Sequence, residues 1–202
     1  MTRYSTQQLN GFTLIEMLVA LSLFTIVITI AAGAFLALIS VSKGVQSEQT
    51  VMTTLTFVLD SMTREIRTGS NYWCNTRAAL QTPAATTAYR DCINGDAGLS
   101  LIESGSSITS AAGNKRIAYY FDTTSSTAKT IMRKVGTNAP QSIVSSGITL
   151  TSVEFFVTGT ERFDINQTNI TQPSVTIVLQ ALDDAGVTTT LQTTVTQREL
   201  DI

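Results

Sequence analysis

The chain has 202 residues, with 13 basic and 15 acidic side chains and a formal net charge of −2. This balance excludes a chain-wide basic surface for nucleic acid, so any contact with nucleic acid would have to be local. The sequence contains no histidine, which removes serine–histidine and cysteine–histidine nucleophile pairs and histidine metal sites. We therefore expect no enzymatic activity, no catalytic residue, no metal site and no cofactor.

The first feature along the chain is a long apolar segment that follows a polar stretch. Residues 17–41 contain no charged side chain, and as a helix they would be about 37 Å long, enough to cross the hydrocarbon of a bilayer. Glu16 stands at the N-terminal edge of this segment, where a carboxylate in lipid costs on the order of a few kcal/mol unless it has a partner. A secretory signal has a shorter apolar stretch with its cleavage site after it, which does not fit this pattern.

Residues 11–16 read Gly-Phe-Thr-Leu-Ile-Glu, and here the chain resembles the type IV pilin superfamily of pilins and pseudopilins. In that family a membrane peptidase cuts after the glycine and methylates the new N-terminal amine. The resemblance implies that residues 1–11 are a leader, that the cut falls between Gly11 and Phe12, and that Phe12 is N-methylated. It also implies that Glu16 pairs with the N-terminus of a neighbouring subunit. The alternatives are a plain signal anchor and a glutamate that reaches back to interfacial water.

The helical period continues past the apolar segment while the polarity rises. We predict one helix from Phe12 to about Thr68, with residues 12–42 as the transmembrane or filament-core half and residues 43–68 as an amphipathic half. Gly69 is the expected C-cap. The apolar stripe of the second half is predicted to pack on the chain's own sheet, with a coiled-coil partner as the alternative. Its members are Val45, Met52, Leu55, Leu59, Met62 and Ile66, and Val41 precedes them in the same helical period.

The two cysteines, Cys74 and Cys92, follow the apolar segment and fall on the exported side. In an oxidising compartment such a pair is predicted to form a disulfide, which would close a polar loop of about 18 residues and contribute roughly 3 kcal/mol. Two separate buried thiols are the alternative, and a two-thiolate metal site would need further ligands. Tyr72 and Trp73 are expected to cover the helix end and the disulfide, with a binding surface as the alternative.

Beyond the loop 74–92 the period changes from helical to alternating. We predict a hairpin at residues 116–122 and 129–135, a strand at residues 151–158 with Val153, Phe155 and Val157 on one face, and a hairpin at residues 174–182 and 187–197. A helix followed by antiparallel strands is an α+β plan, in which the amphipathic half-helix covers one face of a β-sheet built from residues 99–202. The resemblance implies the same plan, a pilin fold whose exported globular domain spans residues 43–202.

The remaining acidic and amide groups are predicted to have ordinary roles. Asp164, Asn166 and Asn169 form an oxygen-rich cluster, but their spacing does not match an EF-hand, so a solvated loop is expected. Asp183 and Asp184 are expected to bond the backbone of their turn.

The basic side chains in the strand region occur as isolated pairs. Lys115-Arg116 and Arg133-Lys134 lie on or beside predicted strands and are expected to face solvent. The sequence has no Gly-rich phosphate loop of the Walker type, so the chain is not expected to be a filament motor.

Shorter stretches at residues 59–67, 119–121 and 191–200 look like the minor pilins and J-type minor pseudopilins. The resemblance implies a minor pilin of a type IV pilus that acts in priming or tip assembly. The alternatives are a minor pseudopilin of a type II secretion system and a filament-borne adhesin or DNA-uptake module. The implied partners are other pilin or pseudopilin subunits, the prepilin peptidase, the assembly platform and membrane lipid. The implied location is the inner (cytoplasmic) membrane, with a single span, and then an extracellular or periplasmic filament.

Overall fold

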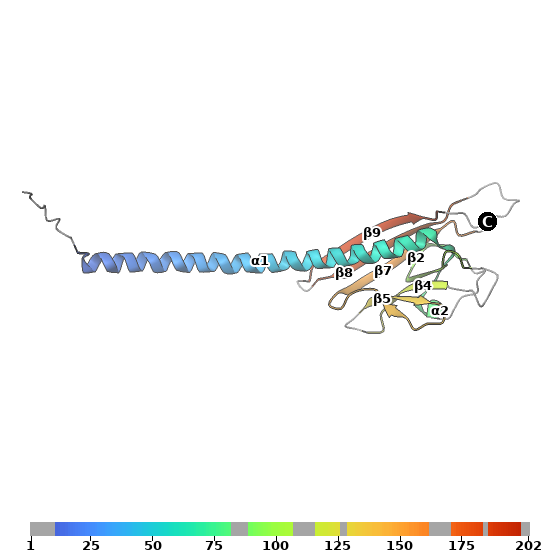
Figure 1. The fold of residues 1–202 in the computed structure, drawn as a ribbon, viewed down its shortest axis with the longest axis horizontal. Coiled ribbons are helices and arrows are strands. Elements are labelled where there is room, and N and C mark those ends of the chain that lie inside the picture. Colours follow the sequence, from blue (N-terminus) through green and yellow to red (C-terminus); the bar gives the residue numbers. More distant parts are fainter. Residues whose placement is uncertain are drawn as a thin grey trace, which may run out of the picture. The chain divides into compact units, whose positions relative to one another are not determined.

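The computed structural model describes residues 11–81, 89–106, 116–125, 129–161, 171–183 and 186–198. The chain divides into two compact units, Met1–Val45 and Gln46–Ile202. The helix α1 (Leu14–Thr68) contributes residues to both units (Figure 1). The predicted long helix is confirmed, except that Phe12 and Thr13 precede it.

The first unit contains the apolar half of α1. Every described residue in the range 11–43 is exposed, and an 18-residue window of the helix has a mean hydropathy of 2.5. The hydroxyl groups of Ser22, Thr25, Thr29 and Ser40 each donate to a backbone carbonyl one turn earlier, at 2.7–2.8 Å. Because these donors are satisfied inside the helix, the segment can enter hydrocarbon without leaving them unpaired. By length and composition it can span a membrane.

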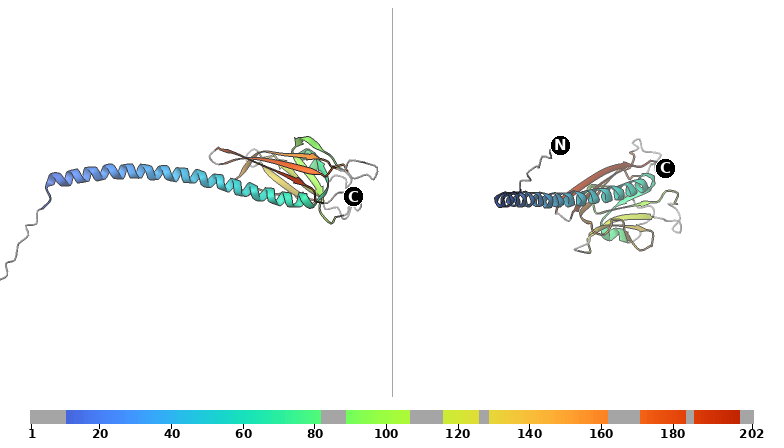
Figure 2. Two further views of the ribbon diagram at one scale, coloured as in Figure 1. Left: turned by 90° about the horizontal axis from the view of Figure 1, so that it is seen from above. Right: turned by 60° about the vertical axis from the view of Figure 1, so that its left-hand side comes forward.

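The second unit contains two antiparallel sheets (Figures 1 and 2). Sheet A has the strand order β1 (Ser70–Cys74), β3 (Gly98–Ile102), β4 (Arg116–Asp122), β5 (Thr130–Val135) and β6 (Gln141–Ser142). Sheet B has the order β2 (Cys92–Asp96), β7 (Thr149–Thr158), β8 (Ser174–Leu182) and β9 (Thr188–Thr196). The α+β plan is confirmed. The prediction of one sheet within residues 99–202 is wrong in two respects, because β1 and β2 precede residue 99 and the strands divide between two sheets.

Both predicted hairpins are present, as β4 with β5 and as β8 with β9. In the second hairpin Asp183 Oδ1 accepts a hydrogen bond from the Val187 N–H at 2.7 Å, which is the turn chemistry expected for this aspartate. Asp184 lies outside the described residues, as do Lys115 and the predicted loop cluster of Asp164, Asn166 and Asn169.

The core lies between one face of α1 and the inward faces of the two sheets. The buried residues of α1 are Val51, Leu55, Val58, Leu59, Met62 and Ile66, and they pack with sheet residues such as Tyr119 and Phe155. Burial of each such side chain contributes about 1.5–3 kcal/mol. The stripe therefore packs on the chain's own sheets, as predicted. Two of its predicted members, Val45 and Met52, are instead exposed. Val45 precedes the buried face, which begins at Val51, and Met52 lies about 100° around the helix from Val51.

Sheet A is covered on both faces. Ile117 and Tyr119 of β4 point into the main core, whereas Ala118 and Tyr120 pack in a smaller cluster with Leu80 of the short helix α2 (Arg77–Gln81). Residues 116–120 are consequently all buried, although side chains along a strand alternate between its faces. The short helix α2 lies within the predicted polar loop between the cysteines and was not predicted from the sequence.

The last turn of α1 ends against β3 and Tyr72. The Gly69 N–H donates to the Glu65 carbonyl at 2.9 Å, so Gly69 occupies the predicted C-cap position. A Cβ at Gly69 would collide with the Leu101 side chain, and glycine is required by this close approach rather than by a left-handed backbone. The buried Tyr72 hydroxyl lies 2.6 Å from the Ile66 carbonyl oxygen and 2.9 Å from that of Gly69. Tyr72 thus covers the helix end, as expected.

The prediction that Arg116 faces solvent is wrong. Arg116 is only 4% exposed. Its guanidinium donates to Ser100 Oγ at 2.8 Å and to the Asn71 carbonyl at 3.0 Å, and it lies over the half-buried Trp73 ring at 6.0 Å from the centroid. Burial lowers the pKa of Arg116 to about 10.

Arg133 and Lys134 also depart from the solvent-facing prediction. Arg133 is half-buried and pairs with Glu65 of α1, while the half-buried Lys134 donates through Nζ to the Gln81 carbonyl at the end of α2. Both charges are partly buried because α1 and α2 cover opposite faces of sheet A. A side chain on either face of the sheet therefore contacts one of these helices.

Candidate functional site

The N-terminal end of α1 begins with a capping threonine. The Glu16 N–H lies 3.3 Å from Thr13 Oγ1 and 3.1 Å from the Thr13 carbonyl oxygen, and the Met17 N–H donates to that carbonyl at 3.3 Å. Thr13 is therefore the N-cap and Glu16 the third helical residue, the spacing of a capping box. The sequence interpretation missed this local role, although the Thr-x-x-Glu pattern was visible in residues 13–16.

Glu16 lies in the first turn of an apolar helix. Its carboxylate is favoured there by the positive end of the helix dipole. Beside it along the helix lie the apolar side chains of Ile15, Val19, Ala20 and Leu23, and no cation among the described residues pairs with it. The geometry therefore offers a single negative group, on an apolar surface, that a cation from another molecule could reach.

The peptide bond between Gly11 and Phe12 lies before the first helical residue. Neither residue belongs to α1, and the Phe12 side chain is 78% exposed. A peptidase needs an extended, accessible backbone, which a helix does not offer. A Cβ at Gly11 would meet nothing within 4 Å, so the fold of the described residues does not itself require glycine there. Residues 1–10 lie outside the description.

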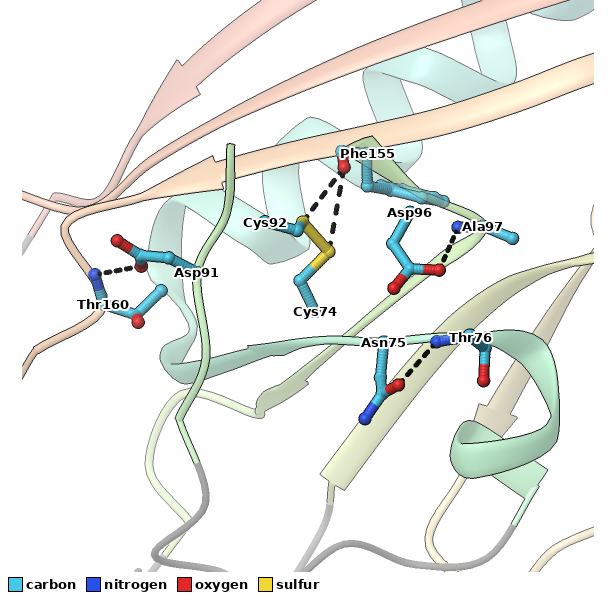
Figure 3. Close-up of a disulfide and its surroundings, with 9 residues drawn as sticks. All are labelled: Cys74, Asn75, Thr76, Asp91, Cys92, Asp96, Ala97, Phe155 and Thr160. Atoms are coloured by element: carbon cyan, nitrogen blue, oxygen red, sulfur yellow. Dashed lines mark hydrogen bonds between the residues drawn. A yellow bond between two sulfur atoms is a disulfide. The ribbon is translucent and has the colours of Figure 1, made fainter. Parts of the chain in front are cut away.

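In the second unit Cys74 and Cys92 form a disulfide, with their Cα atoms 5.9 Å apart. Cys74 ends β1 in sheet A and Cys92 begins β2 in sheet B, so the bridge joins the two sheets. Figure 3 shows both sulfur atoms beside the Phe155 carbonyl oxygen of β7, at 3.7 and 3.1 Å. These are close contacts, since a disulfide carries no hydrogen to donate.

Asp91, next to the disulfide, was not singled out in the sequence. Its carboxylate accepts hydrogen bonds from the Thr160 N–H at 2.9 Å and the Gly159 N–H at 3.1 Å, and the first of these is drawn in Figure 3. The carboxylate thereby holds the residues that follow β7 beside those that precede β2. The role of this carboxylate is therefore structural, because both of its hydrogen bonds are to backbone N–H groups. Among the described residues no group of three or more Cys, Asp or Glu side chains could hold a metal ion.

A family model described as the prokaryotic N-terminal methylation motif matches residues 10–32. The matched segment contains the peptide bond between Gly11 and Phe12, the capping pair Thr13 and Glu16, and the first turns of the exposed apolar helix. Comparison with curated proteins and with solved structures finds no match to this chain. The family evidence therefore bears on the N-terminal segment.

Proposed function

The chain carries a type IV pilin-like prepilin leader, and from this premise we propose that it is a minor pilin, a structural subunit that enters a type IV pilus through its N-terminal helix. The observation that carries the proposal is the methylation motif at residues 10–32, which coincides with a helix whose side chains are exposed and apolar. Such a surface is stable only in lipid or against other apolar helices. Assembly in priming or at the tip is the role that we propose.

The residue roles follow from this proposal. Residues 1–11 are the leader, the peptidase cuts between Gly11 and Phe12, and the new amino group of Phe12 is methylated. Residues 12–42 span the membrane and later form the filament core, while residues 43–202 form the exported domain. The Glu16 carboxylate, which no described cation neutralises, pairs with the N-terminal ammonium of a neighbouring subunit. An unpaired charge in a low dielectric is penalised, so this pairing favours the correct register as a subunit leaves the bilayer.

The partners and the location follow from the same mechanism. Before assembly the subunit sits in the inner (cytoplasmic) membrane with a single span, where membrane lipid covers the apolar half of α1. The prepilin peptidase and the assembly platform act on it there. After assembly the helix contacts other pilin or pseudopilin subunits, and the disulfide-bridged domain is displayed in an extracellular or periplasmic filament.

The test is to determine the mature N-terminus by mass spectrometry after co-expression with an active prepilin peptidase. We expect a chain that begins with N-methylated Phe12. The variant Gly11→Leu should keep its leader, whereas Gly33→Leu, at another glycine with free space around it, should be processed normally. Recovery of the unaltered chain with residues 1–11 still attached, while a control prepilin is cut in the same cells, would overturn the proposal.

A further inference from the structure

Sheet B has one face that no described helix or strand covers. Its inward side chains, such as Phe155 and Ile177, are buried in the core with α1. The side chains that alternate with them on β7, β8 and β9 are half-buried or exposed, and none of them is buried. Sheet A differs, because α1 and α2 pack on its opposite faces. We call the uncovered side the outer face of sheet B.

The strand register places the outer-face residues in rows that cross β7, β8 and β9. Residues that oppose each other in neighbouring strands lie on the same side of a sheet. Neighbouring strands are about 4.8 Å apart, and successive outward residues are about 6.7 Å apart along each strand, so the rows form a nearly regular grid. The rows are Thr158-Ser174-Thr196, Phe156-Thr176-Thr194, Glu154-Val178-Gln192 and Ser152-Gln180-Thr190.

The grid is rich in hydroxyl and amide groups and nearly free of charge. Glu154 is the one charged residue in these rows, and Phe156 and Val178 add a small apolar surface. Hydroxyl and amide side chains can both donate and accept hydrogen bonds. The face has no cations for nucleic acid or for an anionic lipid surface, and its apolar area is too small for an amphipathic helix.

Some of these side chains are held in place before any ligand binds. The Thr176 and Thr194 hydroxyl oxygens lie 2.9 Å apart and share a hydrogen bond between β8 and β9. The Phe156 ring lies against the backbone of Gly95, where an added Cβ would be 2.9 Å from a ring carbon. Groups that are already fixed lose little conformational entropy on binding, so this face is preorganised.

A neutral polysaccharide has the matching chemistry. Each of its sugar rings has apolar C–H faces and an edge of uncharged hydroxyl groups that both donate and accept hydrogen bonds. We propose that the outer face of sheet B binds a neutral polysaccharide chain, with sugar rings against Phe156 and Val178. The sugar hydroxyl groups bond the side chains of Gln180, Gln192 and Thr194.

The outer face remains accessible in the proposed filament. A subunit that assembles through α1 meets its neighbours on the side of sheet B that α1 covers, whereas the outer face is on the opposite side of the sheet. The accessibility in a filament rests on the proposed function. The chemistry of the face belongs to the single chain, so binding is expected before assembly as well.

Retention of the full-length protein by insoluble polysaccharides tests the proposal. The protein is held in lipid nanodiscs, because sugar-based detergents would compete for the site, and empty nanodiscs are the blank. The probes are cellulose, chitin and starch, which are neutral, and alginate, which is acidic. We expect retention by at least one neutral polymer and not by alginate, and release by a soluble oligosaccharide of the same polymer. Retention should be unchanged between about 0.05 and 0.5 M salt, because an uncharged ligand is not subject to screening.

Substitutions within the grid test the site. Thr194→Lys places a long cation on the exposed part of the face and should weaken binding at least tenfold. Phe156→Ala removes the aromatic surface and should weaken binding by a similar factor. Thr53→Lys, at an exposed threonine of α1, is the matched control and should bind as the unaltered protein does. The midpoint of denaturant unfolding is measured for each variant, and Thr194→Lys carries the test if Phe156→Ala is destabilised.

Several results would show that the proposal is wrong. They are failure of all three neutral polymers to retain the protein, equal retention by alginate, retention that falls as salt is added, and equal binding by Thr194→Lys and Thr53→Lys. The assay uses the chain before leader cleavage and without a peptidase, so it does not depend on processing. Failure of the proposed function and failure of this site are therefore separate results.

Discussion

Arg133 of β5 holds Glu65 of α1 by two hydrogen bonds. The Arg133 Nη2 atom donates to Glu65 Oε1 at 2.9 Å, and its Nε atom donates to Oε2 at 3.1 Å. The Tyr119 hydroxyl of β4 donates to the same carboxylate. Burial, together with this bond to Glu65, raises the pKa of Tyr119, so the hydroxyl stays protonated and remains a donor. The cluster ties the last turns of α1 to two strands of sheet A.

The variant Arg133→Ala should lower the free energy of unfolding by about 1–2 kcal/mol, because it removes both bonds from a partly buried carboxylate. Unfolding of the full-length protein in detergent, followed with increasing denaturant, measures this. Arg64→Ala is the matched control, since Arg64 and Asp60 are 3.5 Å apart with side chains 82% and 68% exposed. We expect less than about 0.5 kcal/mol there. A loss below about 0.5 kcal/mol in Arg133→Ala as well would show that the cluster adds little to stability.

The variant Tyr72→Phe should destabilise the C-terminal end of α1. The buried hydroxyl lies within bonding distance of the Ile66 and Gly69 carbonyl oxygens, and its removal takes away a buried hydrogen bond, at a cost of about 1 kcal/mol. Hydrogen exchange of the Gly69 N–H should become faster. Tyr89→Phe, at a tyrosine that is 47% exposed, should leave both quantities unchanged. An unchanged exchange rate in Tyr72→Phe would contradict this role of the hydroxyl.

Asp122, at the end of β4, should contribute stability that is lost in acid. Hydrogen bonding from the Thr124 hydroxyl is the main cause that holds the pKa of Asp122 below its usual value, and the Thr124 N–H at 2.9 Å and Arg77 at 3.1 Å add to it. A lowered carboxyl pKa stabilises the fold above the unfolded-state value of about 3.9, and this stabilisation is lost as the pH falls through the lower folded-state value.

The variant Thr124→Ala should therefore raise the pKa of Asp122 and flatten this part of the acid response. The measurement is the free energy of unfolding between about pH 5 and pH 2. The stability of Thr124→Ala should decrease less over that interval than that of the unaltered protein, whereas Thr123→Ala, at the exposed neighbour, should follow the unaltered protein. If the free energy of unfolding of Thr124→Ala decreased more steeply with falling pH than that of the unaltered protein, this mechanism would be contradicted.

The variant Glu16→Gln tests the pairing role within the proposed function. It keeps the size and polarity of the side chain and removes the charge, so we expect normal membrane insertion and leader cleavage but strongly reduced incorporation into filaments. Quantification of the subunit in sheared filaments measures this. Glu48→Gln, at an exposed position on the same helix, is the control and should assemble normally. Wild-type incorporation of Glu16→Gln would rule out a charge-based pairing.

The extent of α1 and the two hairpins could be predicted because their signals are local. Apolar spacing and the glycine at residue 69 mark the helix, and alternating residues around Asp183 mark the second hairpin. The N-terminal motif is equally local, because residues 11–16 are read as a continuous string. The capping pair Thr13 and Glu16 is also a local signal, so it could have been recognised in the sequence.

Only the tertiary structure decided how the strands divide into two sheets and which charges are enclosed. Arg116 and Arg133 appear in the sequence as ordinary strand cations, and their burial depends on α1 and α2 covering opposite faces of sheet A. The joining of sheets A and B by the bridge from Cys74 to Cys92 likewise depends on pairings between distant strands. Periodicity assigns a residue to one face of its own element. Its neighbours across that face come from segments distant in the sequence, and their packing sets its environment.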